Sequence, residues 1–179
     1  LKYSYKRQYP DTFSPYSVCF FDIETDVLHG TDDPIVITMV YKQELVTLVQ
    51  AQLVQGYADP EGLYFAKLKK HLGDKIEARH YTTHFQIVDD TVSLIREAFK
   101  YIHAWMPDFV AIWNMDFDIP RILDTLKKYK VDPADIFCDP KLPPQYRFCE
   151  YKKGSTKKIT ASGAVKPKNP SEQWHSLLV

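Results

Sequence analysis

Two runs of apolar, largely β-branched residues, separated by only a short polar connection, most constrain how this chain can fold. Residues 35–41 and 45–49 have the composition of strands, and Lys42 and Gln43 leave room for only a tight turn between them. A third apolar segment, 17–25, comes before them and is separated from 35–41 by a stretch rich in Gly, Asp and Pro. We therefore predict three consecutive strands in an antiparallel meander.

Helices are predicted on both sides of a further strand. Residues 90–105 repeat apolar side chains at spacings of three and four, the period of an amphipathic helix. The short apolar run 109–113 is typical of a central parallel strand, and 118–129 has a second apolar helical face. A short helix over 63–72 and an extended segment near 78–87 complete the order. The sequence therefore predicts an α/β fold with a mixed sheet, a meander plus parallel strands, flanked by helices.

Length, composition and charge narrow the class of protein. The chain has 179 residues, enough for one domain with a buried core, and its 45% hydrophobic content excludes a disordered or collagen-like chain. No stretch is apolar enough to predict a membrane span. Eight Lys or Arg and two Glu lie in 141–179, whereas 1–139 hold fifteen basic and twenty-one acidic residues. This distribution suits an acidic metal site beside a surface for an anionic polymer, although a solvated flexible tail explains the basic segment equally well.

We predict three parts along the chain: a lead-in from a preceding domain over 1–16, a folded core over 17–130, and a basic irregular tail over 131–179. The tail is rich in Pro, Gly, Lys and Ser and holds at most one hairpin. That hairpin would join Lys152–Lys153 to Lys157–Lys158, as either a phosphate contact or a solvated turn. Three cysteines without a Cys-x-x-Cys pair indicate a reducing compartment and exclude a disulfide scaffold.

The first candidate functional residues are Asp22 and Glu24. They are two apart on the first predicted strand, so their carboxylates lie on one face while Ile23 lies on the other. Adjacent carboxylates repel each other and resist burial, and a bound cation would relieve both effects. Taken alone, the pair is better explained as a strand end where both acids reach water.

The second candidate is Asp118, where strand 109–113 leads through Asn114 into a predicted helix. In open sheets, ligands bind at such junctions beyond the carboxyl ends of the strands. Taken alone, Asp118 is better explained as a helix cap or first-turn acid. Asp116 is a second choice for the same role, since its spacing places it in the loop.

Together the two segments resemble the DEDD superfamily of 3′–5′ exonucleases, and most closely the proofreading exonuclease domain of family-B DNA polymerases. The resemblance lies in FFDIET at 20–25, similar to the first exonuclease motif, and NxxFD at 114–118, similar to the second. It covers about residues 17–130 and includes the helix before the second strand. It implies a ribonuclease-H-like fold and a proofreading exonuclease within a DNA-directed DNA polymerase, a nucleotidyltransferase of the phage or viral type.

The resemblance also implies a two-metal site. The matching carboxylates of the family hold two divalent ions, so Asp22 would bridge both, Glu24 would bind the water-activating ion, and Asp118 would support the second. Oxygen ligands favour Mg²⁺ or Mn²⁺. Asn114 and Phe117 match family positions near the substrate DNA: Asn114 would bond the terminal nucleotide or fix the loop, and Phe117 would stack on a base or pack in the core.

One departure from the family concerns its fourth acid, which lies in a third motif. No Asp follows Asp139, and neither Tyr146 nor Tyr151 is followed by an acid at the required spacing. Either the chain stops before that motif or the domain has lost its activity. We expect the first, so that this fragment alone binds metal weakly and cleaves slowly or not at all.

The expected partners are the single-stranded 3′ end of a DNA primer and the remaining polymerase domains of the same chain. No membrane is expected, and a phage enzyme would act in the host cytoplasm. Two alternatives remain open: a stand-alone DEDD nuclease acting on RNA or short oligonucleotides, and a non-catalytic nucleic-acid-binding domain with the same fold.

Overall fold

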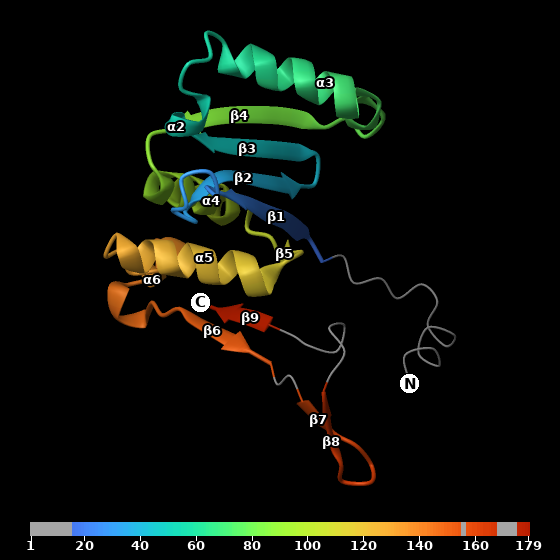
Figure 1. Ribbon diagram of the computed structural model, residues 1–179, viewed down its shortest axis with the longest axis vertical. Coiled ribbons are helices and arrows are strands. Elements are labelled where there is room, and N and C mark those ends of the chain that lie inside the picture. Colours follow the sequence, from blue (N-terminus) through green and yellow to red (C-terminus); the bar gives the residue numbers. More distant parts are fainter. Residues whose placement is uncertain (1–15, 155–156, 168–174) are drawn as a thin grey trace.

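The computed structural model describes residues 16–154, 157–167 and 175–179, and a five-stranded mixed sheet lies at its centre (Figure 1). The strand order is β4-β3-β2-β1-β5. The strands are β1 (Val18–Thr25), β2 (Pro34–Tyr41), β3 (Glu44–Gln50), β4 (Thr82–Val88) and β5 (Phe109–Ile112). β1, β2 and β3 are antiparallel neighbours, whereas β4 is parallel to β3 and β5 is parallel to β1. The predicted meander and the predicted mixed sheet are thus confirmed.

Strand β1 alternates strictly between the two faces of the sheet. Cys19, Phe21 and Ile23 are buried, whereas Asp22 and Glu24 between and after them are exposed. This follows from the two-residue period of a strand, because one face meets the core and the other meets water.

Helices cover the two faces unequally. Helix α4 (Thr91–Trp105) packs across β2 and β3, and the side chain of Asp90 caps it by accepting from the Ser93 amide at 2.9 Å. Helix α3 (Pro60–Ala78) follows the short α2 (Ala51–Val54) and lies on the opposite face, where the Tyr64 hydroxyl is 2.9 Å from Thr47 Oγ1. The predicted helix over 63–72 is therefore real but longer, since Pro60 starts it at a position that needs no N–H donor.

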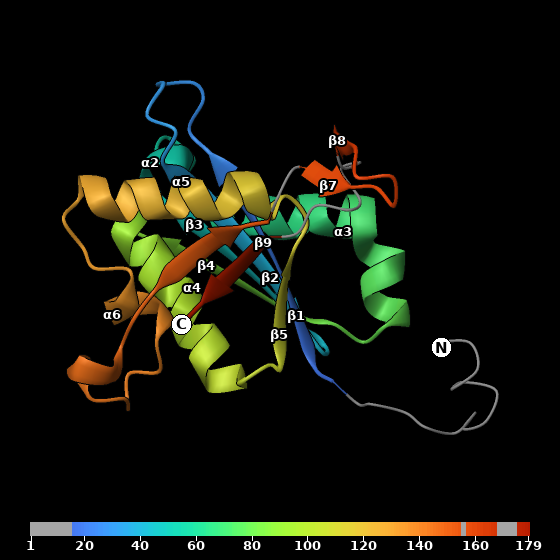
Figure 2. The same cartoon turned by 90° about the horizontal axis from the view of Figure 1, so that it is seen from below.

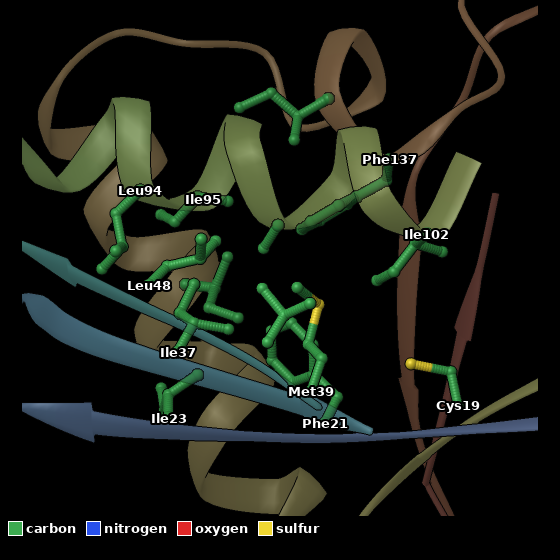
Figure 3. Packing of buried hydrophobic residues seen from close by; sticks show 14 of the residues in the cluster. Cys19, Phe21, Ile23, Ile37, Met39, Leu48, Leu94, Ile95, Ile102 and Phe137 are labelled. Atoms are coloured by element: carbon green, nitrogen blue, oxygen red, sulfur yellow. The ribbon is translucent and has the colours of Figure 1, made fainter. Parts of the chain in front are cut away.

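The hydrophobic core lies between the sheet and α4 (Figure 3). From the strands it takes Phe21, Ile37 and Met39, and from α4 it takes Leu94 and Ile95, all 3% exposed or less. Full burial of each such side chain contributes roughly 1.5–3 kcal/mol to folding. These contacts hold β1 in the centre of the fold and so fix the strand that carries Asp22 and Glu24.

Two predictions near the second motif need correction. Helix α5 (Met115–Lys128) begins at 115 and not at 118, because the Asn114 carbonyl already accepts from the Phe117 and Asp118 amides at 2.9 Å each. Strand β5 is parallel but lies at the edge of the five-stranded sheet, with Phe109 55% exposed, and is not central as predicted. A four-residue apolar run has the same sequence signature in both positions, and tertiary packing decides between them.

The segment after α5 is more regular than its composition predicts. It contains α6 (Ala134–Phe137), the short 3₁₀ helix η1 (Pro144–Tyr146) and two antiparallel strand pairs. β6 (Glu150–Lys153) pairs with β9 (His175–Leu178), and β7 (Lys157–Ile159) pairs with β8 (Val165–Pro167). The predicted hairpin between Lys152–Lys153 and Lys157–Lys158 is therefore wrong, because each pair of lysines has a different partner strand.

Part of this segment also belongs to the folded core. Ile136 and Phe137 of α6 are buried in the main cluster, and Tyr151 of β6 and Leu177 of β9 pack against it. Figure 2 shows β6 and β9 beside α5 and α4, outside the five-stranded sheet. The lead-in predicted over 1–16 lies outside the described residues except for Tyr16.

Candidate active site

Strand β1 presents Asp22 and Glu24 on the face of the sheet that is turned away from α4. Asp22 lies opposite Thr38 of β2, and Glu24 lies opposite Val36. On its other side β1 pairs with β5 only over Val18–Phe21. Among the described residues, no strand flanks this second side of β1 from Asp22 onward. Both carboxylates are exposed and stand where that edge of the sheet is open.

Helix α5 supplies the third carboxylate. Asp118 lies in the first turn of α5, and its amide donates to the Asn114 carbonyl at 2.9 Å. The residue is only 3% exposed, and its Oδ2 has no hydrogen-bond partner in the described part of the chain. A buried carboxyl oxygen without a partner is costly, and such an atom needs an explanation such as a bound ion.

The pKa of Asp118 shows which charges surround it. Burial is the main cause that raises this pKa to about 6, and the charges of Asp22, Glu24 and Asp116 raise it further. Charges act at this strength only over short distances inside a protein. The charges of Asp22 and Glu24 therefore reach Asp118, although the two segments are far apart in the chain. Asp116 joins them as an exposed neighbour in the first turn of α5.

The donor set fits a hard divalent cation. Three carboxylates supply only oxygen ligands, and the unpartnered Oδ2 of Asp118 is available to one. Within residues 16–154, 157–167 and 175–179, no three His, Cys, Asp or Glu side chains are already close enough together to hold a metal ion. Asp22 and Glu24 are exposed, so no packing opposes rotation of their side chains toward Asp118.

Asn114 and Phe117 border the acids at the start of α5. The Asn114 side chain is exposed and makes no capping hydrogen bond, although its backbone carbonyl begins the helix. Phe117 is 39% exposed and lies outside the buried core cluster, which is unlike a core-packing residue. Both side chains are accessible to a ligand at the acidic end of the sheet.

Sequence reasoning missed two accessible neighbours of these residues. The predicted strand 109–113 includes Trp113, but β5 ends at Ile112 and Trp113 is 98% exposed. Arg121 lies one turn after Phe117, with its guanidinium carbon 5.0 Å from the centre of the Phe117 ring, and it forms a 3.0 Å ion pair with Asp32. The i, i+4 spacing of Phe117 and Arg121 was the available signal for this contact.

A cavity of about 510 Å³ lies away from the acids. Phe21, Phe99 and Ile119 are among its lining residues, and Asp108 is the one Asp or Glu side chain among those that the structure describes. Phe21 points to the face opposite Asp22, so this apolar cavity belongs to the core side of the sheet. The candidate active site is the acidic cluster and not this cavity.

The three cysteines are free thiols, and none adds to the site. Burial raises the pKa of Cys19 to about 11, and burial also raises that of Cys149 to about 11. Such thiols stay protonated near neutral pH and are poor nucleophiles.

Fold and site together define a class of protein. The five-stranded mixed sheet, with helices on both faces, agrees with a ribonuclease-H-like α/β fold. The family model of the DNA polymerase family B exonuclease domain matches residues 2–166, and the chain therefore belongs to this family. A comparison with curated proteins gave no match. The matched region includes both motifs and extends beyond 17–130 on both sides.

Proposed function

We propose that this chain is a 3′–5′ exonuclease domain that hydrolyses the 3′-terminal phosphodiester of DNA with two divalent cations, Mg²⁺ or Mn²⁺. Asp22, Glu24 and Asp118 would hold the ions. The observation that carries the proposal is the buried, unpartnered Oδ2 of Asp118, whose pKa responds to the charges of Asp22 and Glu24. A cation between these carboxylates would both supply the missing partner and remove their repulsion.

Each acid would have a different part in the reaction. When bound, the cations would activate the attacking water and stabilise the leaving 3′ oxygen. Asp22 would bind both ions, Glu24 the water-activating ion and Asp118 the other. Asp118 can ligate only as a carboxylate, so its pKa of about 6 makes the complete ligand set available at neutral pH and above.

Asn114 and Phe117 would bind the end of the substrate strand. The exposed Asn114 amide can donate to and accept from the terminal nucleotide. The partly exposed Phe117 ring offers a stacking surface for an unpaired base, and base–aromatic stacking contributes roughly 1–3 kcal/mol. Together they would fix the terminal nucleotide next to the acids.

The proposed setting is proofreading within a family-B DNA polymerase of the phage or viral type. Its partners would be the single-stranded 3′ end of a primer and the polymerase domains of the same protein, in the host cytoplasm. No helix in the described part of the chain combines the length and the apolar character needed to cross a bilayer.

A primer-degradation assay with three variants tests the proposal. A 5′-labelled single-stranded oligonucleotide is incubated with the wild-type chain, Asp22→Ala, Asp118→Asn or Asp116→Asn in millimolar Mn²⁺. We expect slow shortening from the 3′ end by the wild type and by the Asp116→Asn control, and none by the other two variants. Equal shortening by wild type and Asp22→Ala would overturn the proposal. An oligonucleotide left intact by the full-length protein would also overturn it and leave a non-catalytic nucleic-acid-binding domain.

A further inference from the structure

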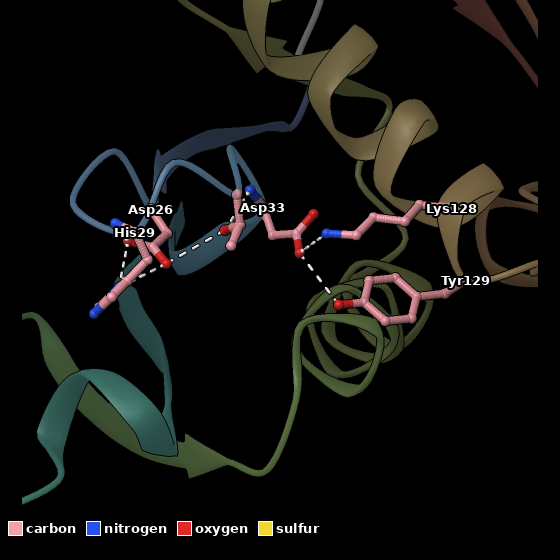
Figure 4. A network of polar contacts seen from close by, with 6 residues as sticks. Asp26, His29, Asp33, Lys128 and Tyr129 are labelled. Atoms are coloured by element: carbon pink, nitrogen blue, oxygen red, sulfur yellow. Dashed lines mark hydrogen bonds and ion pairs between the residues drawn. The ribbon is translucent and has the colours of Figure 1, made fainter.

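Asp33 is a buried carboxylate with three side-chain partners on or next to α5. It lies immediately before β2 and is only 7% exposed. Its Oδ2 accepts from Lys128 Nζ at 2.7 Å and from the Tyr129 hydroxyl at 3.2 Å (Figure 4). Its Oδ1 accepts from Thr125 Oγ1 at 3.2 Å. The Asp33 hydrogen bond is the main cause that raises the pKa of Lys128. We call Asp33, Thr125, Lys128 and Tyr129 the Asp33 cluster.

The backbone of Asp33 is fixed to the end of β1. Its carbonyl accepts from the Asp26 amide at 2.9 Å, and the next residue, Pro34, pairs with Thr25 across the β1–β2 ladder. The Asp26 carboxylate, itself 6% exposed, holds the connection in shape by accepting from the His29 amide at 3.0 Å. The Asp33 cluster is therefore a polar link between the strand that carries Asp22 and Glu24 and the helix that carries Asp118.

Helix geometry places this link on the side of α5 that carries Asp118. Asp118 and Thr125 are seven residues apart, which is about two turns or roughly 10 Å along the axis. Arg121, between them, forms a second link through its 3.0 Å ion pair with Asp32. One stripe of α5 thus carries Asp118 at its beginning and contacts to the β1–β2 connection at two later positions.

The acidic cluster cannot hold α5 in this position by itself. The charges of Asp22, Glu24 and Asp116 all disfavour an ionised Asp118, and its Oδ2 makes no hydrogen bond within the described residues. Without a cation these contacts push α5 away from β1. Asp33 and Asp32 attract α5 instead, through their ion pairs with Lys128 and Arg121.

We propose that Asp33 is a positioning residue for the acidic site: through Thr125, Lys128 and Tyr129 it holds α5 so that Asp118 stays beside Asp22 and Glu24. This inference rests on the proposed function for its metal-binding consequence. The claim that Asp33 holds α5 in place concerns the metal-free chain and does not depend on the proposed function.

The test uses Asp33→Asn and Lys128→Met, with Lys128→Arg as the conservative variant and Asp124→Asn as the control. Asp124 is an exposed acid on α5 outside the Asp33 cluster, so its substitution removes one charge from the same helix. Lys128 is half exposed, so replacing it leaves the core intact. Lys128→Met therefore tests the proposal even if Asp33→Asn fails to fold. Two quantities are measured for each: amide hydrogen exchange without metal, and the dissociation constant of Mn²⁺ by electron paramagnetic resonance.

We expect several-fold faster exchange at the Phe117, Asp118 and Ile119 amides in Asp33→Asn and Lys128→Met. We also expect Mn²⁺ binding weakened about tenfold, the lower end of the loss seen when a residue that orients metal ligands is removed. Lys128→Arg and Asp124→Asn should match the wild type. Faster exchange confined to 125–131, with unchanged Mn²⁺ affinity, would show a local structural role and overturn the positioning proposal. A wild type that binds no Mn²⁺ would instead contradict the proposed function, and the exchange data would still decide the structural part.

Discussion

Asp118 on α5 lies close enough to Asp22 on β1 for the charge of Asp22 to raise the pKa of Asp118, which burial has already raised. Neither residue gains stability from this arrangement in the metal-free chain, because like charges repel and burial disfavours an ionised carboxyl. Functional sites often contain arrangements that cost stability, and favourable contacts elsewhere in the fold compensate for that cost. Here the Asp33 cluster and the core around α5 provide that compensation.

The stability of the metal-free chain should depend on pH through Asp118. Its folded pKa of about 6 exceeds the unfolded value near 4, so the folded state binds more protons between these values. The stability it contributes is present in full below about pH 4 and is lost as pH rises through about 6. We expect Asp118→Asn to be more stable than wild type at pH 7.5, by up to about 3 kcal/mol, and to lose most of this advantage at pH 4.

Urea unfolding at both pH values, with EDTA present, measures this difference. Comparing the two pH values cancels any pH-independent effect of the asparagine side chain itself. The same advantage for Asp118→Asn at pH 4 and at pH 7.5 would contradict a raised pKa.

Divalent cations should stabilise the folded chain only when Asp22 and Asp118 keep their carboxyl groups. A ligand that binds only the folded state at 100 times its dissociation constant stabilises it by about 2.7 kcal/mol. At pH 7.5 we expect Mn²⁺ to raise the melting temperature of the wild type, and to have no such effect on Asp22→Asn or Asp118→Asn. Thermal unfolding over a Mn²⁺ titration measures this.

Asp116→Asn is the matched control for the Mn²⁺ titration, since Asp116 is an exposed acid two residues before Asp118. It should keep most of the Mn²⁺ effect. If Asp116→Asn loses the effect and Asp118→Asn keeps it, the ligand is Asp116 and our assignment is wrong.

Phe117 should contribute to binding of single-stranded DNA by stacking. Replacing Phe117 with Ala should weaken binding of a short oligonucleotide by roughly 1–3 kcal/mol, or about five- to 150-fold. Fluorescence anisotropy in EDTA, which prevents metal-dependent cleavage, measures the affinity. The control is Phe148→Ala, because Phe148 is 54% exposed and lies in the segment between η1 and β6. Equal losses in both variants would indicate a nonspecific effect of removing an exposed ring.

The inner face of α5 should be essential for stability. Ile122 is fully buried in the core cluster, whereas its neighbour Leu123 is only partly buried. We expect Ile122→Ala to lower the free energy of unfolding by about 2–5 kcal/mol, since it leaves a cavity, and Leu123→Ala to lower it less. Denaturant titration of both variants tests this, and a larger loss for Leu123→Ala would mean that α5 is rotated about its axis.

Much of the fold follows from local patterns in the sequence. The β-branched runs 35–41 and 45–49 could only become strands, and their short connection could only make them antiparallel neighbours. The alternation around Asp22 and Glu24 fixed their common face, because the two-residue period of a strand is a local property. The two acidic motifs likewise indicated the family before any coordinates, since residue type and order suffice for that comparison.

Tertiary structure alone decided which of these residues meet. The burial of Asp118, its raised pKa and its closeness to Asp22 depend on how α5 packs against the sheet, and no spacing along the chain encodes that distance. The edge position of β5 and the pairing of β6 with β9 were equally beyond local reasoning. The contacts of Asp33 with α5 join residues more than ninety positions apart. Such pairings form because folding minimises the free energy of the whole chain, in which contacts distant in sequence count as much as local ones.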